Sequence, residues 1–191
     1  MTVRAAASEA HWLELDTNAA AAAVGFLVQS MKSNDLHSIF KALYVADLLH
    51  LERYGRLIAD ESYNAMDYGP VPFAIYNSLC AMRGDERFPI MNEELYSKLE
   101  SVVAMRDLRH LDLAGEPDLD DLSESDIMCL AEAAEKVDAN NFRANTDLTH
   151  DEAWKAARAR RPNAPIRLGD MIDQLDDAER IREHLGHLRS G

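Results

Sequence analysis

The segment DLHSIFKALYVADLLHLERYG, residues 35–55, decides how the rest of the sequence is interpreted. Its apolar residues recur every three or four positions, and this spacing predicts a helix over about 35–54 with one buried face. Gly55 is expected to end the helix, because glycine readily adopts the left-handed conformation found after helix C-termini. The apolar face comprises Leu36, Ile39, Phe40, Leu43, Tyr44, Leu51 and Tyr54.

One acidic side chain, Asp47, falls in the middle of this apolar face, and His50 lies on its flank. A buried carboxylate must accept hydrogen bonds or take up a proton. We therefore expect Asp47 to accept hydrogen bonds from backbone N–H groups of a neighbouring loop and to hold that loop against the helix. The alternative interpretation makes Asp47 and His50 an acid–base pair in an active site.

The loop that we expect Asp47 to hold contains YNAMDYGPVP, residues 63–72. Gly69 permits an unusual φ, and the prolines that follow fix the direction in which the chain enters the next helix. A stiff segment of this kind positions its neighbours, and it would also present Tyr63 and Tyr68 to a partner.

Elsewhere, capping residues and apolar spacing predict mostly helix, while residues 56–69 are predicted to form a loop or a short extended piece. Capping boxes are expected at Ser123–Asp126 and Thr149–Glu152. Residues 106–122 alternate as a β-hairpin does, with a turn at 115–117. Further helices are predicted over about 18–31, 72–82, 92–105, 124–138, 150–161 and 169–188.

The predicted fold class is therefore mainly α, a compact helical domain of about six to seven helices with one small β-hairpin at about 106–122. We expect residues 1–17 to form an N-terminal extension. Residues 18–191 are expected to form a single domain that ends in an amphipathic helix.

Composition argues against several classes of protein. The 191 residues contain 20 Lys and Arg against 34 Asp and Glu, a formal charge of −14. An acidic chain of this kind is not expected to bind nucleic acid or anionic membranes, and no apolar run is long enough to span a bilayer. Two cysteines in apolar helical contexts, Cys80 and Cys129, together with a terminus unlike a signal peptide, predict a cytoplasmic protein.

Common catalytic and nucleotide-binding motifs are absent from the sequence. Residues 118–121 resemble the start of a calcium loop, but the glycine and glutamate that such a loop needs later are missing. We therefore expect no metal and no cofactor. A transcriptional regulator is a weaker alternative, because the single basic cluster is small and consists of Arg158, Arg160, Arg161 and Arg167.

Four motifs in the sequence resemble the signature of a known family. They lie in order at residues 41–55, 63–76, 122–126 and 148–154. They are similar to motifs of the Panacea domain, the SocA-like antitoxin family of bacteria and phages, and the resemblance extends over about residues 18–175. The residues that carry it are Lys41, Tyr44, Asp47, His50, Tyr63, Tyr68, Gly69, Pro70, Val71, Pro72, Tyr76, Thr149, His150 and Trp154.

The resemblance implies a mainly helical domain with a small β element, which neutralises a toxin encoded beside it by binding that toxin directly. In the SocA branch of the family, the antitoxin is a proteolytic adaptor that delivers the toxin to the ClpXP protease. The signature residues are expected to be mainly structural, and no catalytic residue is implied. The rival interpretation is a small hydrolase-like enzyme that uses Asp47, His50 and His150.

Two further expectations concern surfaces and junctions. Thr149, His150 and Trp154 are expected to form a helix junction, with Trp154 in the core. The run 112–126 holds seven acidic residues and no basic one. We expect this run to steer a basic toxin while apolar residues near Tyr63, Tyr68 and the last helix hold it. The acidic residues concerned are Glu116, Asp118, Asp120 and Asp121.

Overall fold

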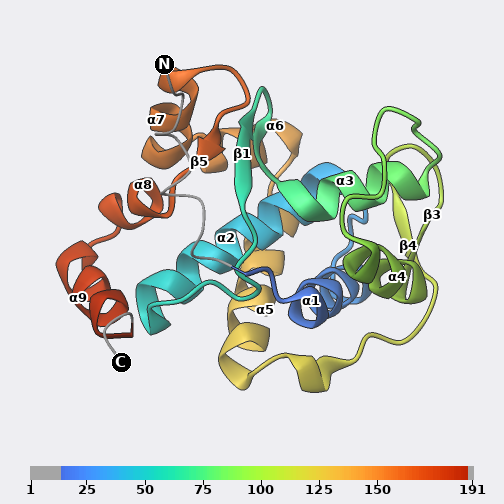
Figure 1. The fold of residues 1–191 in the computed structure, drawn as a ribbon, viewed down its shortest axis with the longest axis horizontal. Coiled ribbons are helices and arrows are strands. Elements are labelled where there is room, and N and C mark those ends of the chain that lie inside the picture. The colour runs from blue at the N-terminus through green and yellow to red at the C-terminus, as the bar shows by residue number, and fades with distance from the viewer. Residues whose placement is uncertain (1–13, 189–191) are drawn as a thin grey trace, which may run out of the picture.

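The computed structural model describes residues 14–188, and within this range the side chains of residues 14–185. The described residues are mainly helical, with two small antiparallel sheets (Figure 1). The helices and strands are α1 Thr17–Ser30, α2 Leu36–Tyr54, β1 Tyr63–Met66, β2 Gly69–Pro72, α3 Phe73–Met82, α4 Glu93–Val102, β3 Val103–Met105, β4 Leu111–Leu113, the 3-10 helix η1 Leu119–Asp121, α5 Glu124–Asp138, α6 Phe142–Thr149, α7 Glu152–Arg160, β5 Pro165–Ile166, α8 Leu168–Asp173 and α9 Ala178–Leu188.

Helix α2 runs through the middle of the molecule (Figure 1). It contributes to two apolar clusters, one with α1, α4 and α5 and the other with β1, α7, α8 and α9. The predicted boundaries and the left-handed cap at Gly55 are confirmed. The predicted single buried face is too narrow, because Ile39 and Leu43 face the first cluster while Tyr44 and Leu51 face the second.

Residues 56–69, predicted as a loop or a short extended piece, contain strand β1, and the pairing of β1 with β2 in a hairpin was not predicted. Strands β1 and β2 pair antiparallel, and β5 pairs with the other edge of β1. Pro70 and Pro72 are compatible with pairing because β2 lies at the edge of this sheet. The carboxylate of Glu61 accepts hydrogen bonds from the N–H groups of Ala74 and Ile75, and it thereby caps α3 from outside the helix.

A second hairpin exists, but the predicted position is wrong. Its strands are β3 and β4, so the turn lies at residues 106–110 and not at 115–117. Asp107 accepts hydrogen bonds from the N–H groups of Arg109 and His110, which stabilises this turn. The second predicted strand is replaced by η1.

Two further predictions about helices need correction. The capping box at Ser123 and Asp126 is confirmed, whereas the one at Thr149 is wrong. Thr149 ends the unpredicted helix α6, and its hydroxyl donates back to the carbonyl of Asn145. Asp151 caps α7 instead. The predicted helix 169–188 is interrupted at residues 174–177, which separate α8 from α9.

Most of the predicted N-terminal extension, residues 1–13, lies outside the described residues. Asp16 caps α1 by accepting hydrogen bonds from the N–H groups of Asn18 and Ala19, and Thr17 already belongs to that helix. Among the described helices, none combines the length and the apolar character that a bilayer crossing requires.

Candidate functional site

The β1–β2 hairpin brings together signature residues that are far apart in the sequence. Lys41 of α2 is 1% exposed, and its Nζ donates to the carbonyl of Pro70 over 2.9 Å. Burial lowers the pKa of Lys41 to about 7. Gly69 has φ +105°, and a Cβ at this position would lie 2.8 Å from both Lys41 Nζ and Thr149 Oγ1. The close contact between hairpin and helix therefore requires glycine.

His150 and Trp154 stack beside this contact, with ring centroids 3.6 Å apart and an interplanar angle of 7°. Trp154 Nε1 donates to the carbonyl of Met66, so the α6–α7 junction is joined to the hairpin. The prediction that Trp154 fills the core is wrong in part: the side chain is half-buried. Arg158 lies over the ring of Trp154, with its Cζ 5.7 Å from the ring centroid, and it forms an ion pair with Asp67.

Tyr68 projects from the tip of the hairpin and is 65% exposed. Its ring meets that of Phe142, which is 55% exposed, edge to face at 5.5 Å. Phe142 in turn stacks on His37, with ring centroids 4.1 Å apart. We call these three side chains the Tyr68 patch. Aromatic side chains of this kind are frequent in protein interfaces.

The expectation that Tyr63 faces a partner is wrong. Tyr63 is 2% exposed, and its hydroxyl donates to Asp47 Oδ2 over 2.7 Å. The other oxygen, Asp47 Oδ1, accepts the N–H of Ile58 over 2.8 Å. Burial raises the pKa of Asp47 to about 7, and these two hydrogen bonds oppose that rise. Asp47 thus holds both the connection after α2 and strand β1.

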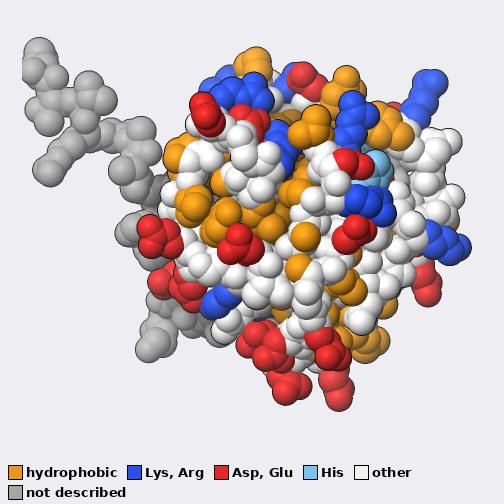
Figure 2. All heavy atoms as spheres, turned by 90° about the vertical axis from the view of Figure 1, so that its right-hand side faces the viewer, with side chains coloured by type: hydrophobic (Ala, Val, Ile, Leu, Met, Phe, Trp, Pro, Cys, Tyr) orange, Lys and Arg blue, Asp and Glu red, His pale blue; other side chains and the backbone are white. Residues whose placement is uncertain are grey.

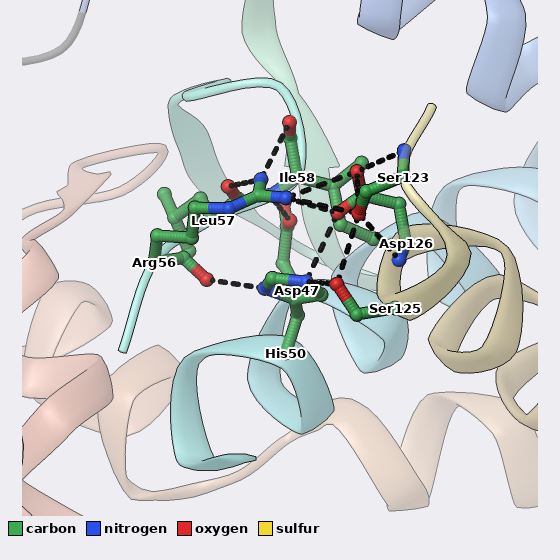
Figure 3. Close-up of polar contacts among 8 residues, drawn as sticks. All are labelled: Asp47, His50, Arg56, Leu57, Ile58, Ser123, Ser125 and Asp126. Atoms are coloured by element: carbon green, nitrogen blue, oxygen red, sulfur yellow. Dashed lines mark hydrogen bonds and ion pairs between the residues drawn. The ribbon is translucent and has the colours of Figure 1, made fainter. Parts of the chain in front are cut away.

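His50 belongs to a polar network that joins α2 to the start of α5 and is linked to Asp47 through Arg56 and Ile58 (Figure 3). Its Nδ1 faces the carbonyl of Arg56 at 3.0 Å and therefore carries a proton, while Nε2 lies 3.0 Å from both Ser125 Oγ and Asp126 Oδ1. The guanidinium of Arg56 also donates to Asp126. Burial alone would raise the pKa of Asp126, but hydrogen bonds from Ser123 and Arg56 lower it.

Tyr44 and Tyr76 complete the set of signature residues on the helices. The hydroxyl of Tyr44 donates to Asp151 Oδ2 over 2.8 Å, and Asp151 also accepts from Gln174. Tyr76 packs edge-on against Phe40. Val71 is half-buried next to the first apolar cluster.

The three residues of the rival enzymatic interpretation, Asp47, His50 and His150, have different direct partners. Asp47 bonds to Ile58 and Tyr63, and His50 contacts the start of α5. His150 stacks on Trp154 at the α6–α7 junction. Within residues 14–185, whose side chains are described, no three His, Cys, Asp or Glu side chains are grouped so that they could hold a metal ion.

The acidic residues expected to steer a partner are all exposed. They surround η1 rather than a strand edge, and Asp118 caps this short helix by accepting the N–H of Asp120. The other three acidic residues of this group are Glu116, Asp120 and Asp121.

Sequence reasoning missed three contributors to the site: Phe142, Asp151 and Glu61. Asn141 could have indicated helix α6, which carries Phe142, because an asparagine before an amphipathic segment is a common helix cap. In the structure, Asn141 accepts the N–H of Ala144. The capping role of Asp151 is local, but its bonds to Tyr44 and Gln174 are not, and neither are those of Glu61 to Ala74 and Ile75. Local sequence patterns do not reveal such non-local bonds.

Comparison with known proteins gives one positive result. The family model described as Antitoxin SocA-like, Panacea domain, matches residues 39–155. No curated protein and no solved structure matches the chain significantly. The matched segment covers more than half of the chain and contains every residue of the signature, from Lys41 to Trp154. The chain therefore belongs to the SocA-like antitoxin family with a Panacea domain.

Proposed function

We propose that this protein is a cytoplasmic antitoxin that neutralises its cognate toxin by binding it directly. The observation that carries the proposal is the family match over residues 39–155. The proposed activity needs no catalytic residue, metal or cofactor, since binding alone blocks the toxin. We expect neither nucleic acid nor a membrane surface as a partner.

Two surfaces are proposed for toxin binding. The Tyr68 patch supplies exposed aromatic area on top of the rigid contact between Gly69 and Lys41. Rigid aromatic side chains lose little conformational entropy on binding, which favours them as anchors. The acidic residues around η1 supply the long-range attraction for a basic toxin.

We further propose that the antitoxin delivers the bound toxin to the ClpXP protease. In that case the toxin disappears from the cell only when both the antitoxin and the protease are present. Measuring the toxin's half-life with and without the protease separates delivery from simple occlusion.

Co-expression with the neighbouring toxin gene tests the proposal. The wild-type chain should restore growth and should co-purify with the toxin. The Tyr68→Ser variant should restore growth less well at equal abundance. Met128→Ser is a matched control, because Met128 is an exposed apolar side chain on α5. Failure of the wild-type chain to bind or neutralise any co-encoded protein would contradict the proposal.

A further inference from the structure

A hollow of about 530 Å³ lies between the α3–α4 connection and the β3–β4 turn. The residues that line it carry three guanidinium groups and one carboxylate, in a protein whose formal charge is −14. Figure 2 views the molecule from this side and shows most Lys and Arg side chains in the upper half of the face, with some Asp and Glu among them, and a group of Asp and Glu at its lower edge. The lining residues are Arg83, Gly84, Asp85, Arg87, Leu108 and Arg109.

Asp85 fixes two of the three arginines. Its carboxylate accepts from Arg83 Nη2 over 3.1 Å and from Arg87 Nε and Nη2 over 2.9 and 2.8 Å. Arg83 Nη1 also donates to the carbonyl of Leu108, so the two walls of the hollow are tied together. One carboxylate cannot neutralise two guanidinium groups, and the hollow keeps a positive charge.

Hydrogen-bond donors remain available at the hollow. Arg87 Nη1 and the whole guanidinium of Arg109 have no hydrogen-bond partner among the described residues. The backbone of Arg109 is nevertheless fixed, because its carbonyl accepts the N–H of Leu36 and its N–H donates to Asp107. A fixed backbone with an unused guanidinium is suited to binding an anionic group.

An exposed apolar side chain lies beside these donors. Leu108 lines the hollow and is 69% exposed. The arginines alone are sufficient to bind a ligand that has only carboxylate groups. The neighbouring apolar area adds a contact that only a ligand with both carboxylate and apolar groups can use.

We propose that this hollow binds an acidic peptide segment of a partner protein, with carboxylates on Arg87 and Arg109 and an apolar side chain against Leu108. A long nucleic acid is disfavoured, because its phosphates would extend over the acidic remainder of the molecule. A short peptide contacts only the hollow and its rim. This inference is independent of the proposed toxin binding, which uses other residues.

The test is fluorescence anisotropy with a labelled peptide in which glutamate and leucine alternate, and with a twin that carries glutamine in place of glutamate. The wild-type protein should bind the glutamate peptide at least about tenfold more tightly than the twin. The Arg87→Glu/Arg109→Glu variant should lose at least about tenfold in affinity for the glutamate peptide. Arg143→Glu/Lys155→Glu is the control, since it changes the net charge equally on exposed residues of α6 and α7, and it should bind like wild type.

Melting curves of both variants establish that they fold. Equal affinity for the two peptides, or an equal loss in the hollow variant and the control, would overturn the proposal. Binding of a single-stranded RNA oligonucleotide as tightly as the glutamate peptide would also overturn it. Sedimentation velocity tests whether the protein self-associates through the hollow. Self-association that the Arg87→Glu/Arg109→Glu variant loses would identify a second copy of the chain as the occupant and would overturn the proposal of a separate acidic partner.

Discussion

The hydroxyl of Tyr63 donates a 2.7 Å hydrogen bond to the carboxylate of Asp47, and both side chains are buried. Asp47 lies on α2 and Tyr63 begins β1, so this bond fixes the hairpin over the central helix. The N–H of Ile58 satisfies the second carboxylate oxygen. The contact of Gly69 with Lys41, at the far end of the hairpin, depends on this placement.

Replacing Asp47 with alanine should lower the free energy of unfolding by about 1–3 kcal/mol, because it leaves the Ile58 N–H and the Tyr63 hydroxyl buried without an acceptor. Chemical denaturation monitored by circular dichroism measures the change. Tyr63→Phe removes the same bond from the other side, and the double variant should lose less than the sum of the two single losses. An Asp47→Ala protein as stable as wild type would contradict this structural role.

Gly69→Ala should destabilise the protein by about 2–5 kcal/mol, since the added Cβ combines backbone strain with a clash against Lys41 and Thr149. Gly84→Ala is the matched control: Gly84 also has positive φ, +78°, but nothing lies within 4 Å of the place that a Cβ would occupy there. The control should lose only about 1–2 kcal/mol from strain. Similar losses in the two variants would mean that the Lys41 contact is not tight.

Local signals in the sequence predicted local structure well. Gly55 as a helix end and Ser123 with Asp126 as a capping box need only their neighbours in the chain. The same reasoning failed at Thr149, because Asp151, two residues later, is the residue that caps α7. The acceptor role of Asp47 followed from a carboxylate on an apolar face, yet Tyr63 as its partner could not, since that pairing arises only when β1 folds onto α2.

Acid should destabilise the wild-type protein partly through His37. Burial is the main cause that lowers the pKa of His37 from 6.5 to about 4, and the charge of Lys41 adds to it. The unfolded chain therefore takes up the proton first as the pH falls, so stability is lost between these two values. His37→Gln removes this contribution, and its free energy of unfolding should fall less than that of wild type between about pH 7 and about pH 5. An identical pH dependence in the two proteins would argue against a half-buried, neutral His37.

Trp154 should show the emission of a half-buried indole in a Trp12→Phe background, where it is the remaining tryptophan. Trp154→Phe preserves a ring beside His150 but removes the N–H that bonds to Met66, and should cost about 1 kcal/mol of stability. Fluorescence spectra and denaturation curves measure the two effects. Emission typical of a fully solvated tryptophan would contradict the stacked junction.

Replacing Glu116, Asp118, Asp120 and Asp121 with serine should slow the association of this protein with its toxin. All four side chains are exposed around η1, so they act at a distance on an approaching basic protein rather than through buried contacts. Such steering weakens with salt, because the Debye length is only ~8 Å at physiological ionic strength. Stopped-flow binding across a salt series should therefore give a lower rate and a shallower salt dependence for the variant, with a nearly unchanged dissociation rate. A rate and salt slope equal to those of wild type would remove these residues from the binding surface, while a change confined to dissociation would place them in direct contact with the toxin.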